Sequence, residues 1–267
     1  MGYLYRRTAP RSEGERRRGV SEERRKLAVI TGTSRGLGLA LAWALAARGW
    51  TLVIDARGAD ALAEACGELA ATTTVRAVVG DVADEAHRTR LIEEARAFGG
   101  LDLLVNNASL LGPSPQPTLE NYPLHVLEDV YRANVFGPLH LIQLALPLLK
   151  ETNDGRIVNV TSDAGVESYE GWGGYGSSKA ALEQLSNVLA AEQPGLRVYW
   201  VDPGDMNTRM QQEAFPGDDV SDRPPPEESV PGLLRLIEGD LPSGRYRARD
   251  LQPTTNAELD ATTGGEP

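Results

Sequence analysis

Short apolar runs and longer amphipathic segments alternate along residues 27–247. Mostly continuous apolar runs of this length are typical of strands buried on both faces of a parallel sheet. They cover residues 27–30, 51–55, 75–79, 101–105, 155–161 and 196–201. The intervening segments predict helices over residues 39–48, 59–70, 86–98, 123–150, 175–192 and 230–237. Strands separated by helices predict an α/β fold, with a doubly wound, Rossmann-like parallel sheet between two helical layers in a single domain.

Some stretches depart from this alternation. Gly137 and Pro138 lie inside the long helical segment and predict a kink. Residues 110–117 are rich in proline and predict a loop. Residues 205–228 are polar and follow a strand end, which suits a mobile lid over a substrate pocket, with a plain connecting loop as the alternative. Residues 244–247 predict a last edge strand.

The two ends of the chain differ from its centre in composition. Residues 1–26 hold nine Lys or Arg and four Asp or Glu with few aliphatic residues, which predicts a disordered basic arm. No apolar segment of the signal-peptide type follows, and a misassigned start codon is the alternative explanation. Residues 27–248 are expected to form the folded domain, and residues 249–267 a disordered tail.

The overall composition narrows the classes of partner. The 267 residues carry a formal net charge of −11, which argues against nucleic acid as a ligand. The single cysteine, Cys66, permits no internal disulfide, so we expect a reducing compartment and cytoplasmic localisation. The three histidines lack metal-ligand spacing and are expected on helix surfaces, so no metal site is predicted. No apolar run reaches the length of a membrane span, so we expect no membrane partner.

A glycine-rich turn follows the first predicted strand directly. It reads Thr31-Gly32-Thr33-Ser34-Arg35-Gly36-Leu37-Gly38, and a segment of helical pattern comes next. Glycines allow a close approach of the backbone, and the free amides of a first helical turn attract anions. A strand, such a turn and a helix in this order therefore indicate a phosphate-binding site.

Tyr175 and Lys179 stand four residues apart, so that a helix would place them one turn apart on the same face. A fixed positive charge favours the phenolate and is expected to lower the pKa of Tyr175, as acid–base chemistry near neutral pH requires. Lysine is rare in this chain, with Lys26 and Lys150 as its only other positions. The spacing alone is also found by chance on helix surfaces, and it gains weight from the phosphate-binding turn.

Together these motifs resemble the short-chain dehydrogenase/reductase family, in its shorter single-domain branch. The glycine turn is similar to the family's nucleotide loop, and Asn106-Asn107-Ala108 to its motif after the fourth strand, although Ser109 stands where glycine is usual. The resemblance covers about residues 27–246 and implies a dinucleotide-binding catalytic domain over residues 27–248. The family's four catalytic residues match Asn134, Ser162, Tyr175 and Lys179.

The resemblance also implies a role for each site residue. Tyr175 would exchange a proton with the substrate oxygen, Ser162 would donate a hydrogen bond to it, and Lys179 would hold the nicotinamide ribose. Asn134 would bend its helix around a water, and Asp81 would bind the adenine edge. Taken singly, Ser162, Asn134 and Asp81 could instead be an ordinary turn cap, a buried polar group and a loop cap. The implied cofactor-binding residues are Gly32, Ser34, Arg35, Gly36, Leu37, Gly38, Arg57, Asp81, Val82, Asn107, Ala108, Tyr175, Lys179, Pro203, Gly204 and Thr208.

The end of the second strand bears on which dinucleotide is bound. NAD binding requires an acidic residue there, whereas NADP binding uses arginine on the 2′-phosphate. The resemblance places Ala56 at the acidic position and Arg57 at the phosphate-binding one, with Arg35 as a second partner. This favours NADP. NAD remains possible, because a shift of one residue would place Asp55 against the ribose.

The expected activity is that of an oxidoreductase, a ketoreductase or alcohol dehydrogenase acting on a small-molecule carbonyl or alcohol. A catalytically silent dinucleotide-binding regulator or scaffold is the main alternative, and the chain has no nucleophile elbow that would indicate a serine hydrolase. By resemblance, a homodimer or homotetramer is expected. A substrate pocket is expected from Ser162, Tyr169, Trp172, Met206 and Met210, with Phe215 as a further apolar side chain.

Overall fold

The computed structural model describes residues 25–251 and contains a seven-stranded sheet in the order β3-β2-β1-β4-β5-β6-β7. Every neighbouring pair of strands is parallel, which confirms the expected doubly wound fold. The strands are β1 Leu27–Ile30, β2 Thr51–Ala56, β3 Val75–Val79, β4 Leu103–Asn106, β5 Arg156–Val160, β6 Arg197–Asp202 and β7 Gly244–Arg247. Residues 1–24 and 252–267, on which most of the expected arm and tail fall, lie outside the described residues.

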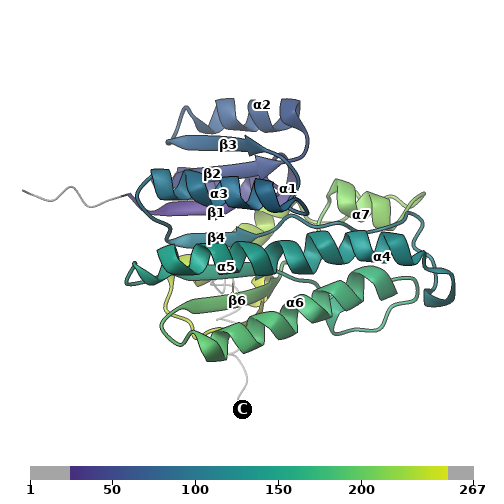
Figure 1. Cartoon of the computed structure of the whole chain (residues 1–267). Helices are drawn as coiled ribbons and strands as arrows, with labels where there is room; N and C mark the ends of the chain where they lie inside the picture. The colour runs from purple at the N-terminus through teal and green to yellow at the C-terminus, as the bar shows by residue number, and fades with distance from the viewer. Residues whose placement is uncertain (1–24, 252–267) are drawn as a thin grey trace, which may run out of the picture.

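Helices cover both faces of this sheet (Figure 1). One face packs against α1 Gly36–Ala46, α2 Ala59–Leu69 and α8 Val230–Glu238. The other packs against α3 Glu85–Ala97, α5 Gly137–Lys150 and α6 Gly173–Glu192, which lie toward the viewer in Figure 1. Strand β1 shows why its apolar run is continuous: Ala28 and Ile30 enter the first core and Leu27 and Val29 the second. Both faces are buried, so no polar alternation is possible.

The strand register brings the carboxyl ends of the strands together. Ile30 pairs with Ile54 on β2 and with Val105 on β4, and Asn106 pairs with Asn159 on β5. The side chains that follow these positions therefore meet at one edge of the sheet. This edge carries the candidate site.

The long segment expected as one kinked helix is divided in the structure. Helix α4 spans Leu124–Tyr131, a π-helical turn spans Arg132–Phe136, and α5 follows. Pro138 lies in the first turn of α5, where its missing N–H is tolerated. The interruption is therefore a widened turn around Asn134, and it falls one turn before the proline.

Three further details differ from the expected boundaries. Residues 209–214 form the short helix α7, inside the stretch expected to be an irregular lid or loop. Helix α6 starts at Gly173, two residues before Tyr175. Ala248–Leu251 form a 3₁₀ turn, so the chain keeps regular structure for three residues into the expected tail.

Among the described residues, no helix is long and apolar enough to cross a bilayer.

Candidate active site

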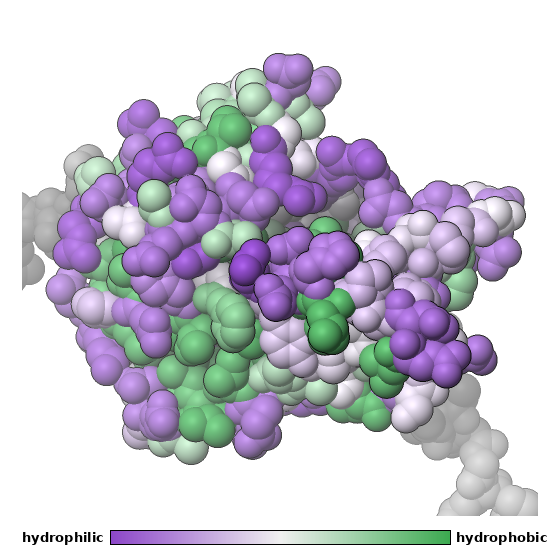
Figure 2. Space-filling model, turned by 45° about the vertical axis from the view of Figure 1, so that its right-hand side comes forward, coloured by the Kyte–Doolittle hydropathy of each residue, from purple (hydrophilic) through white to green (hydrophobic). Residues whose placement is uncertain are grey.

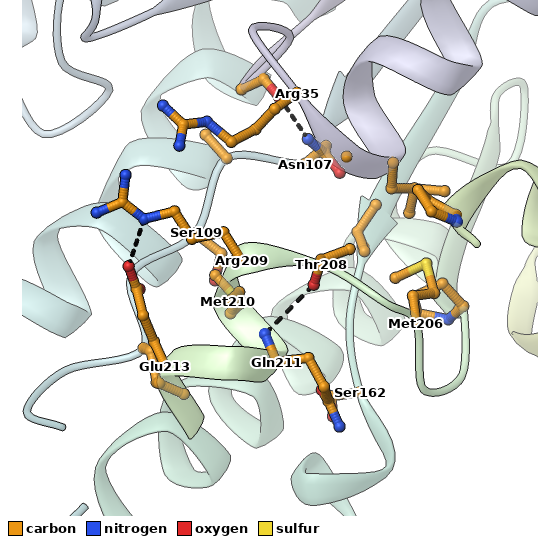
Figure 3. Close-up of a pocket in the computed structure, with 18 of the residues that line it drawn as sticks. Arg35, Asn107, Ser109, Ser162, Met206, Thr208, Arg209, Met210, Gln211 and Glu213 are labelled. Atoms are coloured by element: carbon orange, nitrogen blue, oxygen red, sulfur yellow. Dashed lines mark hydrogen bonds and ion pairs between the residues drawn. The ribbon is translucent and has the colours of Figure 1, made fainter. Parts of the chain in front are cut away.

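A cavity of about 640 Å³ opens at the carboxyl ends of β1, β2, β4, β5 and β6. Its floor is the glycine-rich turn and the ends of the strands, and α7 with the chain before it forms its cover (Figure 3). The cavity therefore runs from the turn before α1 to the start of α6. Most of the residues expected from the motifs line it.

The glycine-rich turn has the geometry of an anion cradle. Gly32 and Gly36 have φ values of +71° and +58°, which side chains other than glycine rarely adopt. A Cβ on Gly32 would lie 2.9 Å from the Cα of Ala108, and one on Gly38 would collide with the carbonyl of Gly32. Helix α1 starts at Gly36 with no acidic residue in its first turn. The backbone amides at this helix end thus lie at the cavity, in an arrangement that suits a diphosphate.

The side chains of Asn107 and Asp55 form hydrogen bonds to the backbone of this turn. The Asn107 amide donates to the carbonyl oxygens of Thr31 and Gly32 at 2.8 and 3.1 Å. The Asp55 Oδ1 atom accepts the backbone N–H of Gly32 at 2.7 Å. Its Oδ2 atom lies 2.8 Å from Nε2 of His87, and both side chains are fully buried. Asp55 borders the cavity, but both of its carboxylate oxygens are engaged with the fold, which weakens the case for Asp55 as a ribose ligand.

The buried His87 contradicts the expectation that the histidines lie on helix surfaces. His87 is 0% exposed, and its ring packs so closely on Gly80 that a Cβ there would collide with it. Burial raises the pKa of Asp55, and its hydrogen bonds to His87 and Gly32 oppose that shift. The pair links β2, α3 and the glycine turn beneath the nucleotide end of the cavity.

The rim at this end is basic. Arg35 and Arg57 line the cavity, and Nη1 of Arg57 lies 3.9 Å from Oδ2 of Asp81. Asp81 Oδ1 also accepts the N–H of Ala83 at 2.9 Å, so the loop-cap role considered for it is present in the structure. Both side chains of the ion pair are exposed, so the pair is weak and can yield to a ligand.

Tyr175 and Lys179 lie side by side on α6, and both are buried. The Lys179 Nζ atom lies 5.4 Å from the centre of the Tyr175 ring and donates to the carbonyl oxygen of Val160 at 2.8 Å. Burial lowers the pKa of Lys179 to about 8. Burial also raises the pKa of Tyr175, partly offset by a hydrogen bond with Ser109, and the charges of Asp163 and Asp202 raise it further. The expected lowering of the Tyr175 pKa by Lys179 is therefore not found in the protein alone, where desolvation shifts the pKa in the opposite direction.

Ser162 stands at the end of β5 and faces the same cavity. Its Oγ atom donates to Oδ1 of Asp163 at 2.9 Å and accepts the N–H of Ala164 at 3.2 Å. The guanidinium of Arg245 on β7 donates to the Ser162 carbonyl at 3.3 Å and binds Glu183 on α6. This network fixes the strand end, and the hydroxyl proton of Ser162 is directed to Asp163.

Asn134 lies behind the cavity wall, in the π-helical turn. Its Nδ2 atom donates to the carbonyl of Leu110 at 2.9 Å and to Oγ of Ser178 at 3.0 Å. Its Oδ1 atom accepts from the N–H of Leu110 and from Oγ of Ser109. The side chain is thereby fully satisfied, and it ties the 110–117 loop to α6 next to Tyr175.

The other end of the cavity is apolar with an acidic edge. Leu111, Trp172, Met210 and Ala214 pack around Tyr175, with the Trp172 and Tyr175 ring centres 5.8 Å apart. Carboxylates of the lining are contributed by Asp163, Asp202, Asp205 and Glu213. The motifs gave no signal for these carboxylates or for Leu111. Asp202 ends β6 and Glu213 lies in α7, while the other three lie between the long elements, and distant contacts bring all five together.

The expected residues fall into two groups in the structure. Those that line the cavity are Gly32, Ser34, Arg35, Gly36, Leu37, Arg57, Asp81, Val82, Asn107, Ala108, Ser162, Trp172, Tyr175, Lys179, Pro203, Gly204, Met206, Thr208 and Met210. Those outside its lining are Gly38, Asn134, Tyr169 and Phe215. Gly38 and Asn134 support lining residues from behind, whereas Tyr169 and Phe215 contact Trp172 from outside. Among the described residues, no cluster of side chains suits a metal ion.

Comparison with known proteins agrees with this geometry. The family model for short chain dehydrogenases matches residues 26–219. The chain is 39% identical over 250 residues to the rhamnolipids biosynthesis 3-oxoacyl-(acyl-carrier-protein) reductase of Pseudomonas aeruginosa, with 90% of each chain covered. It is 35% identical over 196 residues to a benzil reductase ((S)-benzoin forming) of Saccharomyces cerevisiae, covering 70% of this chain and 74% of the relative.

A solved structure with a bound dinucleotide shares this fold. A short chain dehydrogenase of Escherichia coli CFT073, solved in complex with NADPH, matches with a TM-score of 0.75 and 28% sequence identity. The match covers 84% of this chain and 96% of that one.

Proposed function

The chain belongs to the short-chain dehydrogenase family, and we propose that it is an NADP(H)-dependent reductase of apolar carbonyl compounds with Tyr175 as the proton donor. The observation that carries this proposal is one continuous cavity, which joins the glycine cradle to Tyr175, Lys179 and Ser162. The phenol stands beside an ammonium at the end of the cavity that is walled by apolar side chains.

The nucleotide end of the cavity fits NADP. The diphosphate would lie on the amides that follow Gly32 and Gly36, the adenine beside Asp81 and Val82, and the 2′-phosphate between Arg35 and Arg57. The acidic side chain that NAD binding requires at the end of β2 is missing. Ala56 stands at that position, and the carboxylate of Asp55 is engaged with Gly32 and His87. The relative solved with NADPH supports the same choice. Bound NADPH would supply the hydride for the carbonyl carbon.

The protonation states of the site suit reduction. Because burial raises the pKa of Tyr175, the phenol keeps its proton at neutral pH and can give it to the carbonyl oxygen. Lys179, with a pKa of about 8, still carries its charge there and would stabilise the phenolate that remains. Ser162 would turn its hydroxyl from Asp163 to the same oxygen and support the developing charge. Asn134 would act indirectly, through Ser178 and the 110–117 loop.

The chain around α7 is the proposed lid. Residues 205–228 contribute much of the cavity lining, and Thr208 caps α7 by accepting the N–H of Gln211 at 3.3 Å. The Ser114 hydroxyl donates to the carbonyl of Glu213 at 2.7 Å, and this hydrogen bond joins the segment to the 110–117 loop. Opening α7 would admit the substrate, and closing it would exclude water.

We also propose that copies of the chain associate through the outer faces of α4, α5 and α6. Leu124, Phe136 and Val188 are exposed on these helices and on the π-helical turn between α4 and α5. Hydrophobic residues, coloured green, cluster in the lower half of Figure 2, at the height where Figure 1 places α5 and α6. A homodimer or homotetramer remains a prediction, to be checked by the mass in light scattering. Cytoplasmic localisation and the absence of nucleic-acid and membrane partners also remain predictions.

The proposed activity is tested by NADPH oxidation over a panel of ketones and diketones. A reductase oxidises NADPH in the presence of at least one of them, faster than in their absence. A silent dinucleotide-binding protein, the alternative, binds NADPH in a fluorescence titration and oxidises it with none. An alcohol dehydrogenase that prefers NAD would show higher kcat/KM with NADH than with NADPH for the same ketone.

A further inference from the structure

We propose that the substrate end of the cavity selects against negatively charged carbonyl compounds, and that Asp163 is the main residue responsible. The proposal rests on the proposed reductase function and names the substrate class of the same site. It predicts neutral or cationic ketones with an apolar body as substrates. Carboxylates and other anions are expected to be poor ones.

The apolar wall accounts for the body of the substrate. Leu111, Tyr175 and Ala164 are buried and form a cluster with Trp172, Met210 and Ala214. Burying an aromatic or aliphatic group against this wall is favourable by roughly 25 cal/mol for each Å² of apolar surface removed from water. Aliphatic side chains carry no charge that would distinguish an anion from a cation. Selection by the sign of the charge therefore comes from the groups at the edge of this wall.

The edge carries carboxylates without cationic partners. Asp163 and Asp205 line the cavity, and within residues 25–251 neither makes an ion pair. Asp163 is held in place, because Oδ1 accepts from Ser162 and from the N–H of Ala164, and Oδ2 accepts from the Tyr169 hydroxyl at 3.1 Å. Its charge is felt at the catalytic position, where it raises the pKa of Tyr175.

Each cation of the lining lies at the nucleotide end or already has a partner. Arg35 and Arg57 lie at the nucleotide end, and buried Lys179 donates to the carbonyl of Val160. Arg209 on the lid is neutralised by Glu213, with Nε 2.7 Å from Oε1 (Figure 3). Arg249 approaches Gly204 from outside the lining. An anionic substrate would therefore meet Asp163 and Asp205 in the cavity, where the nearest cation of the lining is the hydrogen-bonded ammonium of Lys179. Like charges brought together in this way weaken binding, whereas a cation gains from the same field.

The test uses three aryl ketones whose para substituents are neutral, anionic and cationic. They are para-acetylphenylacetamide, para-acetylphenylacetate and para-acetylbenzyl trimethylammonium, in which a methylene separates the charge from the ring. The ratio of kcat/KM for the cation to that for the anion is measured in wild type and in Asp163→Asn. Dividing the two ratios cancels the intrinsic reactivity of each ketone. We expect the ratio to fall roughly tenfold or more in Asp163→Asn.

Two further variants keep the result interpretable. Asp205→Asn is expected to lower the ratio in the same direction, and it leaves the hydrogen bonds of Ser162 intact. Glu64→Gln removes an exposed carboxylate on α2, away from the cavity, and is expected to leave the ratio unchanged. Ratios in both aspartate variants within about twofold of wild type would overturn the proposal.

A failure of the proposed reductase function can be distinguished from a failure of charge selection. If the wild type reduces neither the neutral ketone nor any ketone of the panel, the activity assignment is wrong. Charge selection is then measured as the dissociation constants of the three ketones from the NADP⁺-loaded protein by calorimetry, with the same expected ratio. If the neutral ketone is reduced but the ratio does not depend on Asp163 or Asp205, the activity stands and charge selection by these residues is wrong.

Discussion

Replacing Lys179 with methionine is expected to stabilise the folded protein at neutral pH and to abolish turnover. Lys179 is 2% exposed, and burial displaces its pKa from the ordinary value of 10.5 to about 8. Each tenfold change in proton affinity is worth about 1.4 kcal/mol, so the charged side chain costs roughly 3 kcal/mol in the folded state. The variant loses the hydrogen bond to the Val160 carbonyl, worth about 1–2 kcal/mol. The net expectation is a gain of about 1–2 kcal/mol.

The sign of the pH dependence follows from the lowered pKa. Below about pH 8, Lys179 is charged in both the folded and the unfolded chain, and the full cost of its burial is present. Between about pH 8 and 10.5 the folded protein has released the proton while the unfolded chain still holds it, so wild type gains stability as pH rises. The advantage of Lys179→Met should therefore shrink as the pH rises through this window.

Urea unfolding at pH values below and above this window measures the effect directly. Lys150→Met serves as the matched control, because Lys150 is exposed in the last turn of α5. The free energy of unfolding of the control is expected to follow that of wild type at both pH values. A Lys179→Met protein that is less stable than wild type at neutral pH, or whose advantage does not change with pH, would refute the reasoning.

Two further substitutions test the nucleotide end of the cavity. Arg57→Ala is expected to shift the ratio of kcat/KM for NADPH over NADH toward NADH by roughly tenfold to hundredfold, since a charged contact to the 2′-phosphate is lost; an unchanged ratio would argue against the assignment. Asp55→Ala leaves the Gly32 N–H and the His87 ring without their acceptor, so we expect a loss of roughly 2–4 kcal/mol in unfolding free energy and weaker NADPH binding. Asp55→Asn keeps an acceptor for Gly32 and should lose less, and equal stability of all three proteins in urea unfolding would contradict the structural role of Asp55.

The sheet and the cradle could be predicted from the sequence because local patterns determine them. A continuous apolar run such as residues 27–30 suits a strand between two helical layers, whereas its register with the neighbouring strands is known only from the structure. The glycine turn is recognisable because Gly32 and Gly36 adopt positive φ values that other residues avoid. The Tyr175–Lys179 spacing places both side chains on one face of α6 for the same local reason.

Features determined by distant contacts could not be predicted in the same way. The π-helical turn at Asn134 differs from an α-helical turn by one residue, and it is held by bonds to Leu110 and Ser178, far away in sequence. His87 lies in a polar helix segment, and its burial depends on the space left by Gly80 and on the carboxylate of Asp55. The helix of residues 209–214 is too short to show a period.

The pKa of Tyr175 shows the same limit for electrostatics. The neighbouring Lys179 was expected to lower it, but spacing alone gives no measure of burial. In the structure desolvation is the largest cause, and it raises the pKa. The direction matters for function, because a phenol that stays protonated is suited to donating a proton.

The most direct test of the central claim is the effect of Tyr175→Phe on chemistry separated from binding. The substitution removes only the hydroxyl, and the phenyl ring that remains keeps the contact with Trp172. We expect the dissociation constant for NADPH to change little, while kcat/KM for the best neutral ketone falls by roughly a hundredfold or more. A variant that binds NADPH as wild type does and reduces the ketone at a comparable rate would show that Tyr175 is not the proton donor.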